Sequence, residues 1–194
     1  MSKKIEFFFD VGSPATYLAW TQLPAIAERH HAELVWKPML LGGVFQATGN
    51  SSPATIEAKG RYTRVDFQRY ANRYGVPLNH NPHFPINTLQ LMRGATAFHG
   101  TEKFQPYLTA IFKAIWQDER DMNQPEVVGE VLANAGFDPT EVMALISNPA
   151  VKEQLKAVTE EAVERGVFGA PTIFVEGEMF FGQDRLEFVE QALA

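Results

Sequence analysis

The sequence predicts an α/β fold in which two β-containing segments near the ends of the chain enclose a long helical stretch. Residues 5–38 have the pattern strand, helix, strand, because apolar residues with β preference stand on both sides of a run with helical spacing. Residues 53–165 show helical periodicity, and two short strands and a last helix follow residue 171. The predicted order is therefore β-α-β, a helical insertion, then β-β-α.

The first strand ends before Asp10, and a helix begins at Ser13-Pro14. Ser is favoured at an N-cap because its oxygen accepts an otherwise unpaired backbone N–H, and Pro at the first helical position lacks such a donor. The helix is expected to run to about His30 with a bend at Pro24, and the next strand covers Glu33 to Pro38. A strand, helix, strand order predicts a parallel pair with a right-handed crossover.

The middle of the chain is marked by glycine, proline and short polar residues. An irregular segment is expected after the second strand, and a loop is expected from Asn79 to Pro85. The glycines and the proline of the irregular segment are Gly42, Gly43, Gly49 and Pro53. The predicted helix starts are Asn87, Thr101, Gln124-Pro125, Asp138-Pro139 and Asn148-Pro149, and the predicted stops are Gly75, Gly100, Gly136 and Gly166.

The last part of the chain returns to the sheet. Thr172–Val175 and Met179–Phe181 are predicted to form a hairpin around the turn Glu176-Gly177. Asp184 is expected to cap a final helix from Leu186 to Leu193, because its carboxylate can accept the first free N–H groups.

Composition and charge exclude several classes of protein. The 194 residues are 45% hydrophobic and 21% charged, as in ordinary globular proteins, and the net charge of -6 argues against a nucleic-acid partner. Met1 to Lys4 leads directly into a strand without the apolar run of a secretory signal, and no window approaches the roughly 18 apolar residues of a membrane span. The absence of cysteine fits a reducing compartment. We therefore expect a cytoplasmic protein without a membrane or nucleic-acid partner.

Two separated motifs resemble the two halves of the thioredoxin active site. Ser13-Pro14-Ala15-Thr16 stands where thioredoxins carry Cys-x-x-Cys at the start of their first helix, and Ala170-Pro171 resembles the loop with a cis proline that faces it. Thiol–disulfide exchange needs an attacking thiolate, so a chain without cysteine cannot perform it. The resemblance thus predicts a thioredoxin-like scaffold with a hydroxyl in place of the nucleophilic thiol.

Several further motifs, in the same order along the chain, resemble one family. They are Phe9-Asp10-Val11-Gly12-Ser13-Pro14, Lys37 to Phe45, Thr48-Gly49-Asn50, Lys59-Gly60-Arg61-Tyr62 with Asp66, Phe84-Pro85-Ile86-Asn87, Phe168 to Thr172, and Phe181-Gly182-Gln183-Asp184-Arg185. Together they are similar to the 2-hydroxychromene-2-carboxylate isomerases and the kappa-class glutathione transferases. This resemblance implies a DsbA-like architecture, with a thioredoxin-like domain at 1–52 and 166–194 and an all-helical insertion domain at 53–165.

The resemblance implies glutathione as cofactor and a glutathione-dependent cis-trans isomerisation. In this reading the Ser13 hydroxyl stabilises the glutathione thiolate, which adds to the ring-opened form of 2-hydroxychromene-2-carboxylate, and elimination after bond rotation gives trans-o-hydroxybenzylidenepyruvate. The implied glutathione-binding residues are Ser13, Asn50, Lys59, Ala170, Pro171, Gln183 and Asp184, and the implied substrate residues are Asn50, His83 and Phe84. The resemblance also implies a homodimer.

Other interpretations stay open at this point. Ser13 by itself could be only a helix cap, Asn50 could close a turn, and Lys59 could lie on a solvated helix face. A kappa-like transferase or peroxidase acting on another electrophile is the first alternative, and a non-catalytic thioredoxin-like binding module is the second. The five histidines are scattered or lack a nearby carboxylate, so no metal site is predicted.

Overall fold

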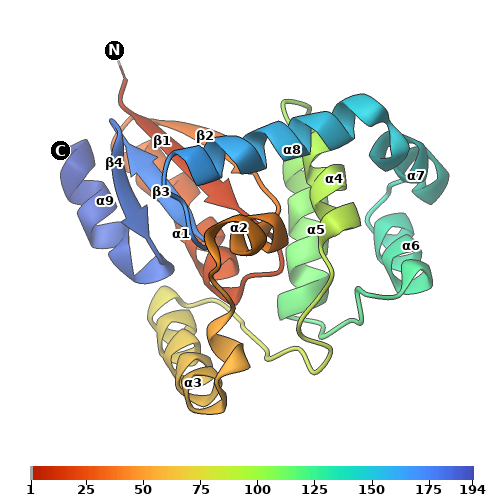
Figure 1. Cartoon of the computed structure of the whole chain (residues 1–194), viewed down its shortest axis with the longest axis horizontal. Coiled ribbons are helices and arrows are strands. Elements are labelled where there is room, and N and C mark those ends of the chain that lie inside the picture. Colours follow the sequence, from red (N-terminus) through yellow and green to blue (C-terminus); the bar gives the residue numbers. More distant parts are fainter. Residues whose placement is uncertain (1) are drawn as a thin grey trace.

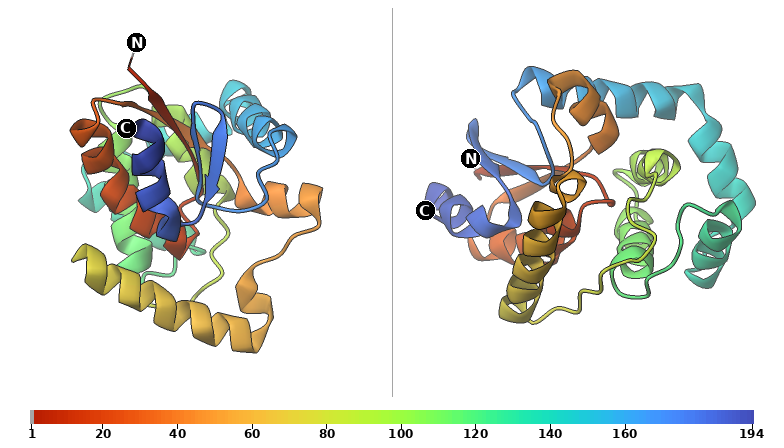
Figure 2. Two further views of the ribbon diagram at one scale, coloured as in Figure 1. Left: turned by 90° about the vertical axis from the view of Figure 1, so that its left-hand side faces the viewer. Right: turned by 60° about the horizontal axis from the view of Figure 1, so that its bottom comes forward.

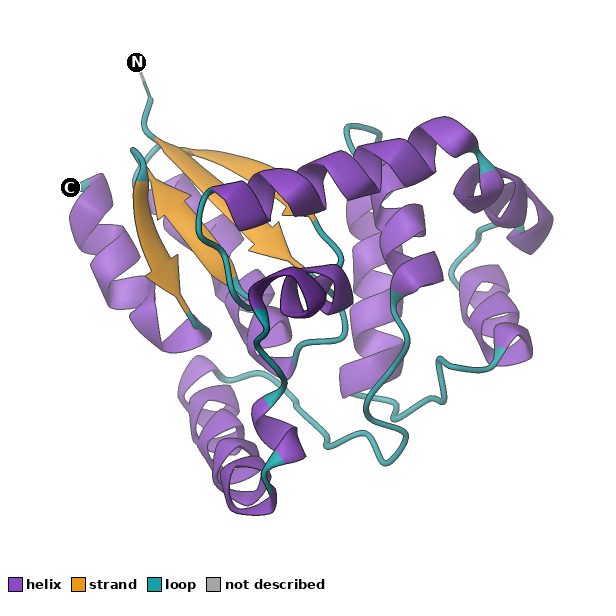
Figure 3. Ribbon diagram, in the orientation of Figure 1, coloured by secondary structure: helices purple, strands orange, loops and turns teal. Residues whose placement is uncertain are grey.

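The computed structural model describes residues 2–194 and contains one mixed sheet, with helices on both sides (Figures 1 and 3). Its strand order is β2-β1-β3-β4, with bounds β1 Lys4–Phe9, β2 Glu33–Pro38, β3 Thr172–Val175 and β4 Glu178–Phe181. Strands β1 and β2 are parallel, whereas β3 is antiparallel to both β1 and β4. The predicted parallel pair and the predicted hairpin are both confirmed.

The described residues contain nine α-helices and two short 3-10 helices. The α-helices are α1 Pro14–Arg29, α2 Leu41–Thr48, α3 Glu57–Tyr74, α4 Leu89–Phe98, α5 Phe104–Trp116, α6 Pro125–Asn134, α7 Pro139–Ser147, α8 Pro149–Glu164 and α9 Leu186–Leu193, and the 3-10 helices are η1 Pro53–Thr55 and η2 Gln183–Arg185. The predicted α/β fold with helices between its two β segments is therefore confirmed.

Two local predictions were wrong. The glycine-rich segment after β2 is not irregular, because residues 41–48 form α2. Glycine is a poor helix former, but Val44 is buried, and a Cβ at Gly43 would lie 3.2 Å from the Thr159 methyl carbon of α8, so this glycine permits close packing. Asp184 does not cap α9; it lies in η2, and its Oδ2 accepts from Arg185 Nη1 at 2.6 Å.

Alternating side chains divide the sheet between two packed layers. Ile5, Phe7 and Phe9 belong to the main core with α1, α5 and α9, whereas Phe8 and Phe174 face a smaller core that includes residues of α8. Figure 2 shows α8 passing along one face of the sheet, with α1 and α9 on the other. The period-2 alternation of the strands thus buries both faces.

The helical part of the chain shares its core with the sheet. The Phe104 ring of α5 lies 6.5 Å from that of Phe9 and 5.7 Å from that of Trp36, measured between ring centroids. Buried residues of α4 and α5 belong to the same core cluster as β1. We keep the division into two domains at residues 53 and 165 as a proposal.

Gly94 is expected to be the least replaceable helical glycine. A Cβ there would lie 2.1 Å from the Tyr107 hydroxyl, which is buried and donates to the Leu91 carbonyl at 2.8 Å. Gly94→Ala should lower the free energy of unfolding by about 1–3 kcal/mol through overpacking. Gly129→Ala in α6, where nothing lies within 4 Å, should instead raise it by about 0.5–1 kcal/mol. Urea unfolding of both variants measures the difference, and a neutral Gly94→Ala would contradict the packing argument.

Candidate active site

A cavity of about 1100 Å³ lies at the start of α1. Its lining comes from the turn before α1 and the start of α1, residues 40–57, α3, the loop before α4, Trp116 at the end of α5, and residues 168–170 with 181–185. In Figure 1 these segments surround the N-terminal end of α1. Predicted site residues far apart in the sequence therefore meet around one cavity.

Ser13 links α1 to the loop before β3. Its Oγ accepts the Thr16 N–H at 3.1 Å, as an N-cap should, and donates to the Ala170 carbonyl at 3.0 Å. The side chain is buried at the wall of the cavity. The Ala170-Pro171 peptide is cis, as predicted. The hydroxyl therefore sits at the positive end of the helix and opposite the backbone of residue 170, where an anion would be stabilised.

Asp10 is a buried carboxylate that holds three walls of the cavity together. Oδ1 accepts the Gly12 N–H at 2.9 Å, and Oδ2 accepts the Leu41 N–H at 2.8 Å and the Thr88 hydroxyl at 2.9 Å. Burial raises the pKa of Asp10, although the three hydrogen bonds oppose that shift. The carboxylate thus joins the turn before α1, the start of α2 and the start of α4.

The turn that carries Ser13 is also anchored by the helical part of the chain. The Val11 N–H donates to the Met92 sulfur at 3.4 Å, and the Val11 carbonyl accepts from the Trp116 indole N–H at 2.9 Å. Gly12 is required here because a Cβ would lie 2.7 Å from the Thr88 methyl carbon. The position of Ser13 therefore depends on α4 and α5 as well as on the sheet.

Two predicted residues lie across the cavity on η2. Gln183 is 5% exposed, and its amide forms no hydrogen bond with residues 2–194 although the Tyr74 hydroxyl donates to its backbone carbonyl. Gly182, with φ at 101°, lets the chain turn so that the Asp184 carboxylate comes close to it; a Cβ would lie 2.5 Å from Oδ1. The Gln183 amide atoms are not fully buried and Gln183 lines the cavity, so the amide is accessible to a ligand there.

Asn50 and Lys59 also line this cavity. The Asn50 amide donates to the Phe168 carbonyl at 2.7 Å, so it connects the end of α2 to the loop before β3. Lys59 is exposed on α3 and has no ion pair within 4.0 Å in the described part of the chain. Six of the seven implied glutathione residues line the cavity: Ser13, Asn50, Lys59, Ala170, Gln183 and Asp184. The seventh, Pro171, directly follows Ala170 in the sequence.

Of the implied substrate residues Phe84 and His83, only Phe84 lines the cavity. Phe84 lines the cavity, with its ring 6.2 Å from that of Trp116. His83 is not among the lining residues; its Nδ1 lies 3.6 Å from Asp121 Oδ2. His80 lines the cavity instead and approaches Arg64. A role for His83 in substrate binding stays a prediction that these contacts do not favour.

Sequence reasoning missed Asp10, Arg64, His80 and Trp116 as cavity residues. A carboxylate directly after an apolar strand was the available signal for Asp10. Arg64 and His80 carry no comparable signal, because their position depends on how α3 packs.

No group of three or more His, Cys, Asp or Glu suited to a metal ion occurs within residues 2–194. No helix in that range is long and apolar enough to span a membrane.

Comparison with known proteins agrees with this geometry. A family model for the DSBA-like thioredoxin domain matches residues 4–194. A 2-hydroxychromene-2-carboxylate isomerase from Sphingobium xenophagum is 32% identical over 198 residues, covering 100% of this chain and 99% of the relative. The chain belongs to the DSBA-like thioredoxin family, in the group of these isomerases and the kappa glutathione transferases.

Two further proteins of this group are similar to the chain over nearly its whole length. Human glutathione S-transferase kappa 1 is 28% identical over 211 residues, covering 100% of this chain and 92% of the relative. A solved structure of a 2-hydroxychromene-2-carboxylate isomerase superimposes with a TM-score of 0.86 at 29% identity, covering 98% of this chain and 94% of that one. The prediction of a DsbA-like enzyme fold is confirmed, since these full-length relatives are enzymes.

Proposed function

We propose that the protein is a glutathione-dependent isomerase that interconverts 2-hydroxychromene-2-carboxylate and trans-o-hydroxybenzylidenepyruvate. The observation that carries the proposal is that the Ser13 hydroxyl, bonded to the Ala170 carbonyl, and the Gln183 side chain line one cavity. Its relatives named as isomerases, matched over their whole length, support the same reaction.

The residues of the cavity fit the chemistry of glutathione, which carries two carboxylates, one ammonium and one thiol. Gln183 offers an amide for its γ-glutamyl end, Asp184 offers the carboxylate oxygen that does not bond Arg185, and Lys59 offers a cation for a carboxylate. The Ala170 backbone offers a carbonyl for an added strand. When bound, glutathione supplies the thiolate that adds to the substrate and leaves again after bond rotation.

Ser13 performs its role by exchanging one hydrogen-bond partner for another. Its hydroxyl has a single proton, which goes to the Ala170 carbonyl in this structure. To stabilise a thiolate the hydroxyl turns toward the sulfur, and the freed Ala170 carbonyl accepts an N–H from the ligand instead. The Thr16 N–H holds the Ser13 oxygen in place during this exchange.

The rest of the cavity fits an aromatic second substrate. Phe84, Trp116 and Leu78 give it apolar walls, and glutathione alone does not require this additional lining. Aromatic rings contribute large apolar contact areas with little loss of conformational entropy. A kappa-like transferase on another aromatic electrophile would use the same walls and is the alternative.

Calorimetry and a spectrophotometric assay test the proposal together. Glutathione should bind with one site per chain, and the absorbance of 2-hydroxychromene-2-carboxylate should change only when glutathione is present. Conversion of generic electrophiles without isomerisation would favour the transferase, and no glutathione binding at millimolar concentration would favour a non-catalytic module. Light scattering on the same sample tests the proposed homodimer. The candidate contacts are the exposed apolar side chains of Tyr62 and Val65 on α3 and of Ile56, the residue before α3.

A further inference from the structure

The carboxylates that line the cavity are already engaged. Glu57 pairs with Arg61, Asp66 with Arg69 at 3.2 Å, and Asp184 with Arg185 at 2.6 Å. Asp10 accepts three hydrogen bonds from neutral donors. Of the three lining cations, Arg185 is the partner of Asp184, whereas Lys59 and Arg64 have no carboxylate within 4.0 Å among residues 2–194. The cavity therefore offers positive charge that its own carboxylates do not neutralise.

Arg64 differs from the other arginines of α3. Arg61, Arg69 and Arg73 each pair with a carboxylate and are absent from the cavity lining, whereas Arg64 lines the cavity and contacts an imidazole. These four side chains share one helix and the same charge, so helix propensity does not explain the difference. Arg64 lies four residues from both Gly60 and Gln68, so it shares the face of α3 that lines the cavity.

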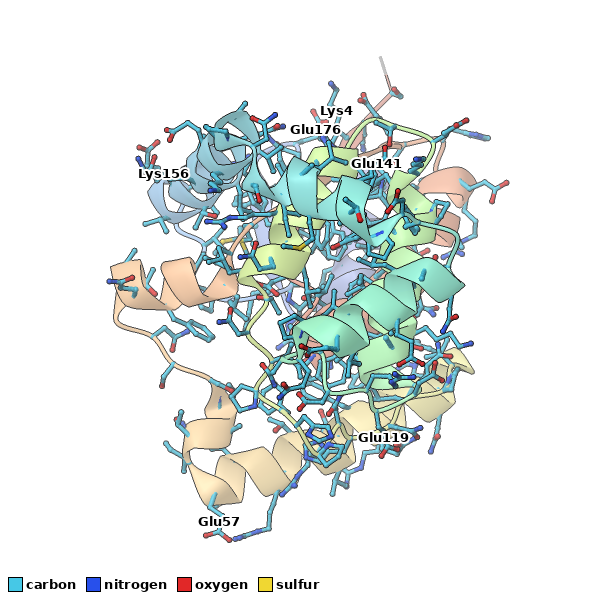
Figure 4. All side chains as sticks on the ribbon, turned by 90° about the vertical axis from the view of Figure 1, so that its right-hand side faces the viewer. Lys4, Glu57, Glu119, Glu141, Lys156 and Glu176 are labelled. Carbon is cyan, nitrogen blue, oxygen red and sulfur yellow. The ribbon has the colours of Figure 1, made fainter. Side chains whose placement is uncertain are left out.

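The contact with His80 orients Arg64 without neutralising it. Arg64 Nη1 lies 3.3 Å from His80 Nε2. Burial, and next the Arg64 charge, lower the pKa of His80, so the imidazole is neutral at pH 7 and accepts the arginine N–H. Glu119 is the carboxylate whose charge opposes this shift, and Figure 4 shows it in the loop that faces α3. Glu119 forms no ion pair with Arg64 within 4.0 Å in the described residues.

We propose that Arg64 binds the carboxylate of an anionic aromatic second substrate and thereby selects it over uncharged electrophiles. The inference rests on the proposed function, because it concerns the substrate half of the same cavity. The guanidinium can accept a carboxylate through two parallel N–H bonds, while the apolar wall of Phe84 and Trp116 holds the ring. Arg64 is a binding residue in this proposal and takes no part in proton transfer.

A matched pair of inert ligands tests the role of charge. trans-Cinnamate and trans-cinnamamide have nearly the same shape and differ in the carboxylate, and both are titrated calorimetrically into wild-type protein with and without saturating glutathione. Wild type should bind cinnamate more tightly than cinnamamide. Arg64→Gln should weaken cinnamate binding about tenfold and leave cinnamamide unchanged, while Arg64→Lys should keep part of the affinity because an ammonium provides charge but no fork.

Arg61→Gln is the control, because it removes the same charge one turn away on α3 from a side chain that does not line the cavity and pairs with Glu57. Circular dichroism checks that each variant is folded. Equal loss of cinnamate affinity in Arg61→Gln and Arg64→Gln, or equal affinity of wild type for the two ligands, would overturn the proposal. Failure of glutathione to bind would overturn the proposed function instead, and it is read from a separate titration.

Discussion

Ser13→Ala is expected to lower glutathione-dependent turnover by about 10²-fold or more while the protein stays folded. Removing one preorganised donor to an anion in an active site typically has an effect of this size. The lost N-cap bond to Thr16 should cost about 1 kcal/mol, a small part of the stability of a domain; the Ala170 carbonyl also loses its donor, but it lines the cavity, where water can replace the hydroxyl. For a chain of this length that corresponds to a fall in Tm of about 2–4 °C.

Asn148→Ala is the matched control for that variant. Asn148 caps α8 in the same way, because its side chain accepts the Ala150 N–H at 2.9 Å and Pro149 follows it, but it does not line the cavity. Both variants should lose similar stability, and only Ser13→Ala should lose turnover and raise the thiol pKa of bound glutathione, measured by thiolate absorbance. Unchanged turnover in folded Ser13→Ala protein would show that Ser13 is only a cap.

Asp10→Ala is expected to have the largest effect on stability. It would leave the Gly12 N–H, the Leu41 N–H and the Thr88 hydroxyl without their acceptor. An unsatisfied buried donor costs about 1–3 kcal/mol; the Thr88 bond is buried and the two backbone bonds are partly buried, so the total is on the order of 3 kcal/mol, a large part of the stability of many domains. Thr88→Val, which removes one of these bonds, should cost about 1 kcal/mol and serves as the control. Urea unfolding measures both; a loss below 1 kcal/mol in Asp10→Ala would contradict this role.

Comparison of wild type with Asp10→Asn tests how the free energy of unfolding depends on the protonation of Asp10. Because burial raises the folded-state pKa of Asp10 above its unfolded value, the folded state binds the proton more tightly. The stabilising contribution of the protonated carboxyl is complete below the unfolded pKa, about 3.9, and is lost as the pH rises through the folded pKa. The stability advantage of wild type over Asp10→Asn should therefore shrink as the pH increases from acid toward neutral.

The structure also explains where local sequence rules failed. Gly42 and Gly43 indicated an irregular segment, but the Leu41 N–H bond to Asp10 and the close approach of Thr159 to Gly43 favour a helix there. Asp184 resembled an N-cap, but the positive φ of Gly182 turns the chain so that its carboxylate meets Arg185. At Gly43 a contact from a residue distant in sequence outweighed local propensity, whereas at Asp184 the cap is replaced by a contact with the next residue along the chain.

The order of the four strands, the Ser13 cap, the hairpin and the helix starts at Asp138 and Asn148 could all be predicted from the sequence. These depend on side-chain period and on hydrogen bonds between neighbours in the chain, which a sequence records directly. Only the tertiary structure decided that Asp10 ties three cavity walls together and that Arg64, alone of four arginines on one helix, lines the cavity. Both depend on packing between segments far apart in sequence, and the orientation of an exposed helix such as α3 is set by those contacts and not by its own residues.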